Sequence, residues 1–448
     1  MSLAEEAVAE VATASPRHRG GSSQKAAPSR RARPASLTAV IALVARRGML
    51  LLAMVTVAGV EAAVMLQRGA QWRGDLIWTI DWLAVGFIVV GPVVAAFAAV
   101  DTARLSLGAA HLSRNRVTRT PAFGLFAVYT VGVGAVHGCA LLVGLVISAP
   151  PAWPPAMAAA IMVQLLIISL FAALGTLVGR FLTTVLAGIV AALVAFAAVY
   201  LLSVDYGPVA MLVTGMATIP RVGYDYNVTY LLAQVVMLVL AITAALVLRP
   251  LHGRSLRRVT GADAGVALGA VALAAAVAWT GPPERLSESA ATPTFCGAVQ
   301  TVPTCFYPEH ERVATAFQEQ FAALVQASER FGYADLLPSR VEEASRTVLP
   351  TGEDVAPFFV MPEHLQGQAP TAWEIVLGFV QPVHCEQVQG EAPPSDRYWE
   401  DLSALTATWA GLVDPTAAET AGYFGEPLPP EAAVTLAEQF RTCTYPHF

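Results

Sequence analysis

Four charged or titratable side chains fall inside or at the ends of long apolar runs, where they are costly unless paired. A charge at the centre of a bilayer costs about 2.5 to 3.5 kcal/mol on insertion scales, so such residues tend to be paired and functional. Glu61 and Asp81 could line a cation or substrate path, or could instead lie at headgroup level beside loop arginines. The histidine could relay protons or only join two helices by hydrogen bonds. In chain order these candidates are Glu61, Asp81, His137 and Arg180.

Motifs for self-contained enzymatic chemistry are missing from the sequence. There is no GxxxxGK[ST] phosphate loop, no HExxH pair and no GxSxG nucleophile turn. The histidines of the C-terminal part, His310, His364 and His384, each stand alone. We therefore expect no catalytic residue, no metal site and no cofactor in this chain. Any ATP-driven work would come from a partner, and we expect no nucleic-acid partner.

Charge divides the chain into two parts. Lys and Arg number 20 against 10 Asp and Glu over residues 1–282, whereas residues 283–448 carry 7 against 23. The whole chain is 55% hydrophobic and only 13% charged, about half the charged fraction of an ordinary soluble domain. This division predicts a basic membrane part, 37–282, and an acidic soluble domain, 283–448. Residues 1–36 are polar and basic, which predicts a disordered cytoplasmic arm.

Apolar runs of spanning length recur along the membrane part. A transmembrane helix needs roughly 20 apolar residues, and residues 37–47 fall short and end in two arginines, which predicts an interfacial helix. The fold class expected is thus an all-α polytopic membrane protein followed by a mostly helical domain. The predicted spans are residues 48–66, 76–100, 123–147, 156–178, 181–202, 230–248 and 262–280.

Arginine placement predicts the orientation. With the N-terminus in the cytoplasm, the inner segments carry the basic arm, the arginines of residues 101–120, Arg180 and those of residues 249–258. Tryptophan and tyrosine gather at the opposite interface, as is typical of aromatic belts. Seven crossings would then place residues 283–448 outside the cytoplasm, in a protein of the plasma membrane.

The cysteines agree with an oxidising location for the C-terminal domain. Four of the five cysteines lie there, and an even number in such a compartment indicates two disulfides with three possible connectivities. We favour Cys296–Cys305 and Cys385–Cys443 over free thiols or a metal site, because no CxxC or paired histidine accompanies them. In this domain the residue pattern predicts helices over 309–331, 397–413 and 430–441, and a short strand at 358–361.

We expect residues 101–120 to be an arginine-rich, helical cytoplasmic loop, which could contact a cytoplasmic partner or act only as a positive-inside anchor. Together with the apolar residues 37–47, the Gly91-Pro92 run and the Gly175–Arg180 turn, it resembles the membrane subunits of ABC-2-type exporters over about residues 37–248. A seventh span and the acidic, cysteine-bearing domain depart from that family's core and are similar to a subset of such permeases in high-GC bacteria. In the family this loop is a coupling helix, which here would comprise Asp101, Arg104, Arg114, Arg116 and Arg119.

The resemblance implies a permease without its own ATP site, energised by a separate cytoplasmic ATPase and paired with a second copy or a sister permease. The alternative is a membrane-anchored receptor or scaffold whose external domain binds a ligand or envelope component. The sequence leaves the substrate and the direction of transport open.

Overall fold

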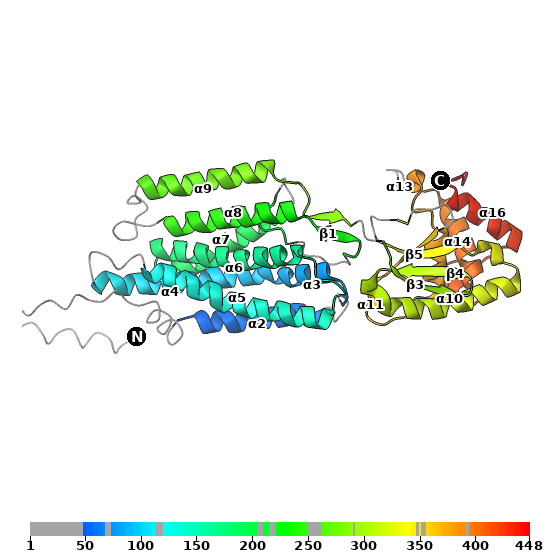
Figure 1. The fold of residues 1–448 in the computed structure, drawn as a ribbon, viewed down its shortest axis with the longest axis horizontal. Helices are drawn as coiled ribbons and strands as arrows, with labels where there is room; N and C mark the ends of the chain where they lie inside the picture. The colour runs from blue at the N-terminus through cyan, green and yellow to red at the C-terminus, as the bar shows by residue number, and fades with distance from the viewer. Residues whose placement is uncertain are drawn as a thin grey trace, which may run out of the picture.

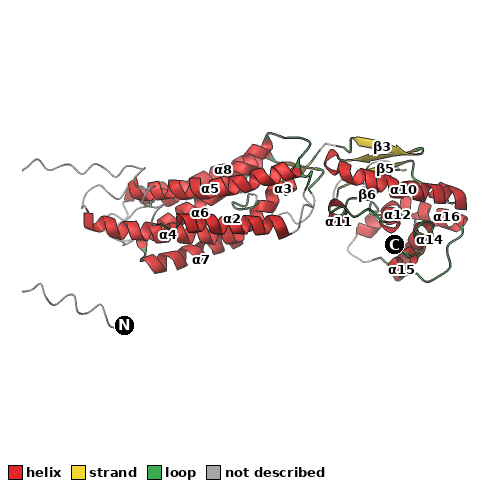
Figure 2. Cartoon of the chain, turned by 90° about the horizontal axis from the view of Figure 1, so that it is seen from below, coloured by secondary structure: helices red, strands yellow, loops and turns green. Residues whose placement is uncertain are grey.

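A computed structural model describes residues 48–67, 73–112, 120–203, 209–214, 221–248, 261–289, 292–345, 349–350, 355–389 and 394–448. The predicted arm (1–36), the interfacial helix (37–47) and Arg114, Arg116 and Arg119 lie outside these residues. The chain forms a helical bundle with a separate domain beyond one end of it, as both views show (Figures 1 and 2). We call that end of the bundle the domain end and the opposite one the far end.

Seven helices in the described residues are long and apolar enough to span a bilayer, as the sequence predicted. The second of these spans consists of three consecutive pieces: α3 (Leu76–Leu83), the 3-10 turn η1 (Ala84–Gly86) and α4 (Phe87–Leu112). The other six are α2 (Leu50–Gln67), α5 (Thr120–Ser148), α6 (Ala156–Phe181), α7 (Thr184–Leu202), α8 (Val228–Val247) and α9 (Gly261–Thr280).

The second spanning element continues beyond its predicted membrane span. That span was expected to end at residue 100 and the loop after it to be helical, and α4 runs through this boundary without a break to Leu112. At 1.5 Å per residue, Leu76–Leu112 is roughly 55 Å long, against a hydrocarbon core of about 30 Å. Arg104 is therefore a residue of α4, and α4 runs directly into the arginine-rich segment.

Small residues bring α4 against α6 and α7. A Cβ added to Gly175 would lie 2.3 Å from the carbonyl oxygen of Ala95, and one added to Gly179 would lie 2.4 Å from that of Ala99. Such contacts let helix backbones approach closely without a hydrophobic driving force. The tight turn predicted at Gly175–Arg180 is displaced, because these residues belong to α6, and the chain turns at Leu182 and Thr183, between α6 and α7.

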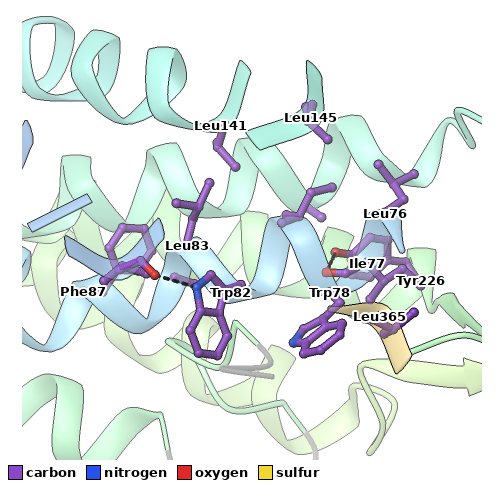
Figure 3. Close-up of a cluster of buried hydrophobic side chains, with 14 of the residues drawn as sticks. Leu76, Ile77, Trp78, Trp82, Leu83, Phe87, Leu141, Leu145, Tyr226 and Leu365 are labelled. Atoms are coloured by element: carbon purple, nitrogen blue, oxygen red, sulfur yellow. Dashed lines mark hydrogen bonds between the residues drawn. The ribbon is translucent and has the colours of Figure 1, made fainter. Parts of the chain in front are cut away.

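Aromatic and aliphatic side chains fill the domain end of the bundle (Figure 3). Leu83 of α3 faces Leu141 and Leu145 of α5, and all three are buried. The indole Nε1 of Trp82 donates to the carbonyl oxygen of Val64 at 2.8 Å, which joins α3 to α2.

The C-terminal domain contains a sheet that the sequence analysis did not predict, apart from one strand near residue 358. Strands β3 (Phe295–Val299), β4 (Val302–Phe306), β5 (Arg340–Ala344) and β6 (Val355–Phe359) pair in that order. The first pair is antiparallel and the other two are parallel. The expectation of a mostly helical domain therefore needs correction to a mixed α/β arrangement.

Helices cover this sheet and supply most of the domain's core. The predicted helices correspond to α10 (Glu311–Phe331), α14 (Asp396–Ala410) and α16 (Pro430–Arg441). Ring contacts link Phe306 of β4, Phe317 of α10 and Phe358 of β6. The remaining helices are α11 (Pro362–Leu365), α12 (Ala372–Val380), α13 (Glu386–Gln389) and α15 (Ala417–Ala421).

Two cysteine pairs lie at bonding distance in this domain. The Sγ atoms are 2.09 Å apart in Cys296 and Cys305, and 2.04 Å apart in Cys385 and Cys443. This is the pairing that the sequence favoured. The first pair joins directly opposite residues of the β3–β4 hairpin, and the second joins the segment before α13 to the segment after α16.

The domain and the bundle are connected by a short two-stranded ribbon. Strand β1 (Tyr224–Tyr226) precedes α8, strand β2 (Leu286–Glu288) follows α9, and the two pair in antiparallel fashion. The domain's polypeptide thus leaves the bundle through a fixed hydrogen-bonded element.

Candidate functional site: polar clusters along the second span

Glu61 and His137, both singled out from the sequence, meet inside the bundle. The imidazole Nδ1 of His137 lies 2.7 Å from Oε1 of Glu61, and its Nε2 lies 2.9 Å from Oε1 of Gln164. The amide nitrogen of Gln164 in turn donates to the carbonyl oxygen of Ile80 at 2.8 Å. We call these three side chains and the Ile80 carbonyl the Glu61 chain; it joins α2, α5, α6 and α3.

The order of donors in the Glu61 chain fixes the tautomer of His137. A carbonyl oxygen can only accept, so the nitrogen of Gln164 must face Ile80 and its oxygen must face His137. His137 therefore carries hydrogen on Nε2. The contact with Glu61 then holds one proton, either on Nδ1 beside a carboxylate or on the carboxyl beside a neutral ring. Both forms are neutral as a pair, which is the arrangement that low-dielectric surroundings tolerate best.

One oxygen of the Glu61 chain has no donor. Glu61 is only 1% exposed, and its Oε2 is buried without a hydrogen-bond partner. Because Oε2 is an acceptor in either protonation form, it lacks a donor in both. The Cβ position of Gly86 in η1 lies 3.9 Å from Oε1, so the chain lies beside the irregular turn of the second span.

Asp81 does not join the Glu61 chain. It forms a buried two-point ion pair with Arg285, at 2.6 Å from Nη1 to Oδ2 and 2.7 Å from Nη2 to Oδ1. The hydroxyl of Tyr226 donates to Asp81 at 3.1 Å, and the guanidinium lies over the Tyr226 ring at 5.0 Å. We call these three residues the Asp81 cluster. It fastens α3 to β1 and to the residue before β2, at the base of the C-terminal domain.

The remaining described candidates are joined to helix ends. Oδ2 of Asp101 accepts the backbone N–H of Met49 and the hydroxyl of Tyr129, each at 2.8 Å. Arg104 lies 3.7 Å from Asp101, with half of its side chain exposed. Arg180 donates to the carbonyl oxygens of Leu246 and Leu248 at the end of α8. Asp101 and Arg180 thus hold the far end of the bundle together.

A fourth polar cluster, at the junction of the bundle and the domain, was not predicted. His310 follows β4, and its Nδ1 lies 2.5 Å from Oε1 of Glu343 in β5. Asp75, on the bundle side, accepts the N–H groups of Trp78 and Arg221. The His310 pKa is raised because Glu343, Asp75 and Glu309 outweigh its burial. We call Asp75, Glu309, His310 and Glu343 the His310 cluster.

Burial sets the charge preference of Asp75 and Glu309. Burial is the largest cause raising the pKa of Asp75, with a smaller contribution from Asp81, and the same holds for Glu309, whose carboxylate neighbours are Asp75 and Glu343. Gly74 is required at this junction, because its φ is +89° and a Cβ there would lie 2.1 Å from the carbonyl oxygen of Glu309. The bundle and the domain are thus in close backbone contact beside His310.

In the described residues, one group of side chains has the spacing of a metal site: His384, Cys385 and Cys443. The two sulfurs are bonded to each other, and the Nε2 of His384 lies 2.8 Å from the carbonyl oxygen of Arg441. The two sulfurs and one imidazole nitrogen of this group are therefore already engaged. Elsewhere in the domain, a hydrogen bond from His364 lowers the pKa of Glu374 to about 2, which fits a helix-capping carboxylate.

The second span connects these clusters. Asp75 and Asp81 contact the domain or its ribbon, the Ile80 carbonyl ends the Glu61 chain, and Asp101 lies near the far end of the same element.

Comparisons with protein-family models, with curated proteins and with solved structures returned no match.

Proposed function

We propose that this chain is the membrane subunit of an ABC-2-type exporter, energised by a separate ATP-binding subunit at the far end of the bundle. In this proposal the far end faces the cytoplasm and the C-terminal domain lies outside. The permease works as a homodimer or beside a sister permease in the plasma membrane. Alternating access rocks the spans around a central path.

The observation that carries the proposal is the continuity of Leu76–Leu112. A helical element longer than the bilayer core can transmit a push at its cytoplasmic end to the opposite side. Its domain-end residues reach the C-terminal domain through Asp81 and Arg285, and Ile80 receives the Glu61 chain. The arginine-rich segment that follows Leu112 is where the partner would act.

The test is association with the ATP-binding subunit. The full chain is purified from its native membranes, and co-purifying ATP-binding subunits are identified by mass spectrometry. Changing Arg114 and Arg116 to Glu is expected to lower the amount of co-purified ATP-binding subunit at least tenfold relative to the unchanged chain. The matched control changes Arg254 and Arg257 to Glu, which alters the same charge in another basic loop and is expected to retain the partner. Association that survives the first change contradicts the assignment of the coupling segment.

A second candidate function is favoured by a cavity at the junction. It has a volume of about 610 Å³ and is lined by bundle and domain residues, among them Trp153, Tyr224, Asp225 and Glu309. A receptor that binds a ligand there would need no ATP-binding partner. Absence of any such subunit from the purified chain, together with ligand-dependent protection of Trp153 from oxidation, would favour the receptor.

A further inference from the structure

A groove of about 450 Å³ runs between α2 and α5 and is open along one side. Its walls are small or flexible apolar side chains, and the acidic residue among them is Glu61. From α2 they include Met54, Ala58, Ala62 and Met65, and from α5 they include Ala135 and Cys139. The groove is thus a shallow apolar seam between two helices, and Glu61, whose side chain is buried beneath it, is the acidic residue of its lining.

The chemistry of Glu61 selects what can bind here. Its Oε1 is occupied by His137, whereas Oε2 is buried without a donor. A bare metal ion is disfavoured, since Ca²⁺ and Mg²⁺ require six or more oxygen ligands and the groove offers one carboxyl group. An anion is disfavoured by the carboxyl group itself. The complement is an apolar body with one N–H donor.

We propose that the α2–α5 groove binds a lipophilic amine from the bilayer, with its alkyl body along the apolar walls and its ammonium N–H donating to Oε2 of Glu61. Entry displaces the side chain of Met54 or Met65, which line the groove and are flexible. The ammonium gains a charge-assisted hydrogen bond and supplies the donor that the buried oxygen lacks. The proton shared by Glu61 and His137 leaves as the ammonium enters, so that the buried site stays neutral. That this amine is the exported molecule rests on the proposed function; the binding itself does not.

Cys139 provides a reporter for occupancy. It is the free cysteine, it is exposed, and it lines the groove. The full chain is placed in phosphatidylcholine nanodiscs, and the rate of Cys139 alkylation by a membrane-permeant maleimide is measured with dodecylamine present. We expect at least tenfold slower alkylation at saturating dodecylamine. Dodecane and trimethyldodecylammonium, which lack an N–H donor, are expected to slow the rate less than twofold.

Matched variants separate the groove from the rest of α2. Ala62→Phe fills the groove and is expected to remove the protection by dodecylamine, with each rate normalised to the same variant without amine. Ala63→Phe adds the same ring at the neighbouring exposed position, which does not line the groove, and is expected to keep the protection. Glu61→Gln retains an acceptor without a charge and is expected to weaken protection, and Glu61→Met is expected to remove it.

The proposal is overturned if dodecane or trimethyldodecylammonium protects Cys139 as well as dodecylamine does, because the groove would then hold only an alkyl chain. It is also overturned if Ala62→Phe leaves the protection unchanged. Thermal unfolding of each variant shows whether it is folded. If Glu61→Met fails to fold, Ala62→Phe still tests the groove, because it leaves the Glu61 chain in place. If dodecylamine protects Cys139 but no ATP-binding subunit co-purifies with the chain, the amine-binding groove is supported and the exporter function is refuted.

Discussion

The Asp81 cluster holds the C-terminal domain on the bundle, and replacing Asp81 with Asn tests that role. The side chains of Asp81 and Arg285 are 0% and 5% exposed, and two bonds of 2.6 and 2.7 Å join them. Removal of one partner leaves a buried, unpaired guanidinium, which costs about 3 to 5 kcal/mol. At 1.4 kcal/mol per factor of ten, the open form of the ribbon should become roughly 100- to 4,000-fold more populated.

Trypsin cleavage after Arg285 measures this opening, because the arginine is buried in the closed form. We expect cleavage at the Arg285–Leu286 bond in Asp81→Asn to accelerate by at least 100-fold. Mass spectrometry of the released domain identifies the cleaved bond. Glu400→Gln, which alters an exposed carboxylate, is the control and should cleave as the unchanged chain does.

The double variant Asp81→Leu with Arg285→Met, followed by its melting temperature, checks the reasoning from the other side. Replacing both charges with apolar groups of similar size is often neutral or stabilising, so this variant should melt within a few degrees of the unchanged chain. Cleavage of Asp81→Asn at the original rate would refute the idea that the ion pair fastens the domain.

Three further predictions concern the helix contacts and the other clusters. Gly175→Ala should destabilise the bundle by about 1 to 3 kcal/mol through overpacking on α4. Gly138→Ala, whose added Cβ meets nothing within 4 Å, should not destabilise it. Equal melting temperatures of the two variants in detergent would contradict this prediction. Gln164→Leu leaves the N–H of His137 without an acceptor and should cost about 1 to 3 kcal/mol, while Ser169→Ala, which loses only a bond within α6, should cost less in the same melt. Because the pKa of His310 is raised in the folded chain, its stabilisation is complete below its ordinary value near 6.5 and disappears as pH rises through the raised value. The raised pKa values of Asp75 and Glu309 act in the same direction, so cleavage after Arg285 should accelerate from neutral to alkaline pH, and His310→Gln should flatten that profile.

The spans were predictable because hydropathy over 20 residues needs no tertiary information. Predicted starts and ends such as 156–178 and 262–280 lie within three residues of α6 and α9. For the second span, polarity predicts where the helix leaves the lipid, near residue 100, but does not mark where the helix itself stops, so its continuation to Leu112 had no sharp signal.

The pairings of the polar residues were much less predictable. Glu61 and His137 were each singled out, but their contact depends on how α2 and α5 pack, and Gln164 was passed over although it interrupts an apolar run. Asp81 meets a partner 204 positions later, for which a single sequence gives no signal.

The sheet of the C-terminal domain was missed for local reasons. The β3–β4 hairpin turns at Gln300, which has a positive φ of 52°, and such turns are usually recognised by Asn or Gly. Strand β5 contains Glu343, an acidic residue whose buried carboxyl group is paired with His310 and accepts the N–H of Tyr307. Its polar sequence therefore does not read as a strand.

A reporter fused to Phe448 tests the central claim most directly, namely that the chain threads the bilayer seven times and leaves its C-terminal domain outside. Alkaline phosphatase is active only outside the cytoplasm, and a green fluorescent protein that folds only in the cytoplasm provides the opposite signal. The account predicts phosphatase activity and no fluorescence for fusions at residue 448, and the reverse for fusions at the Arg249–Arg258 loop. Cytoplasmic fluorescence at residue 448 would contradict the orientation, the disulfides and the exporter together.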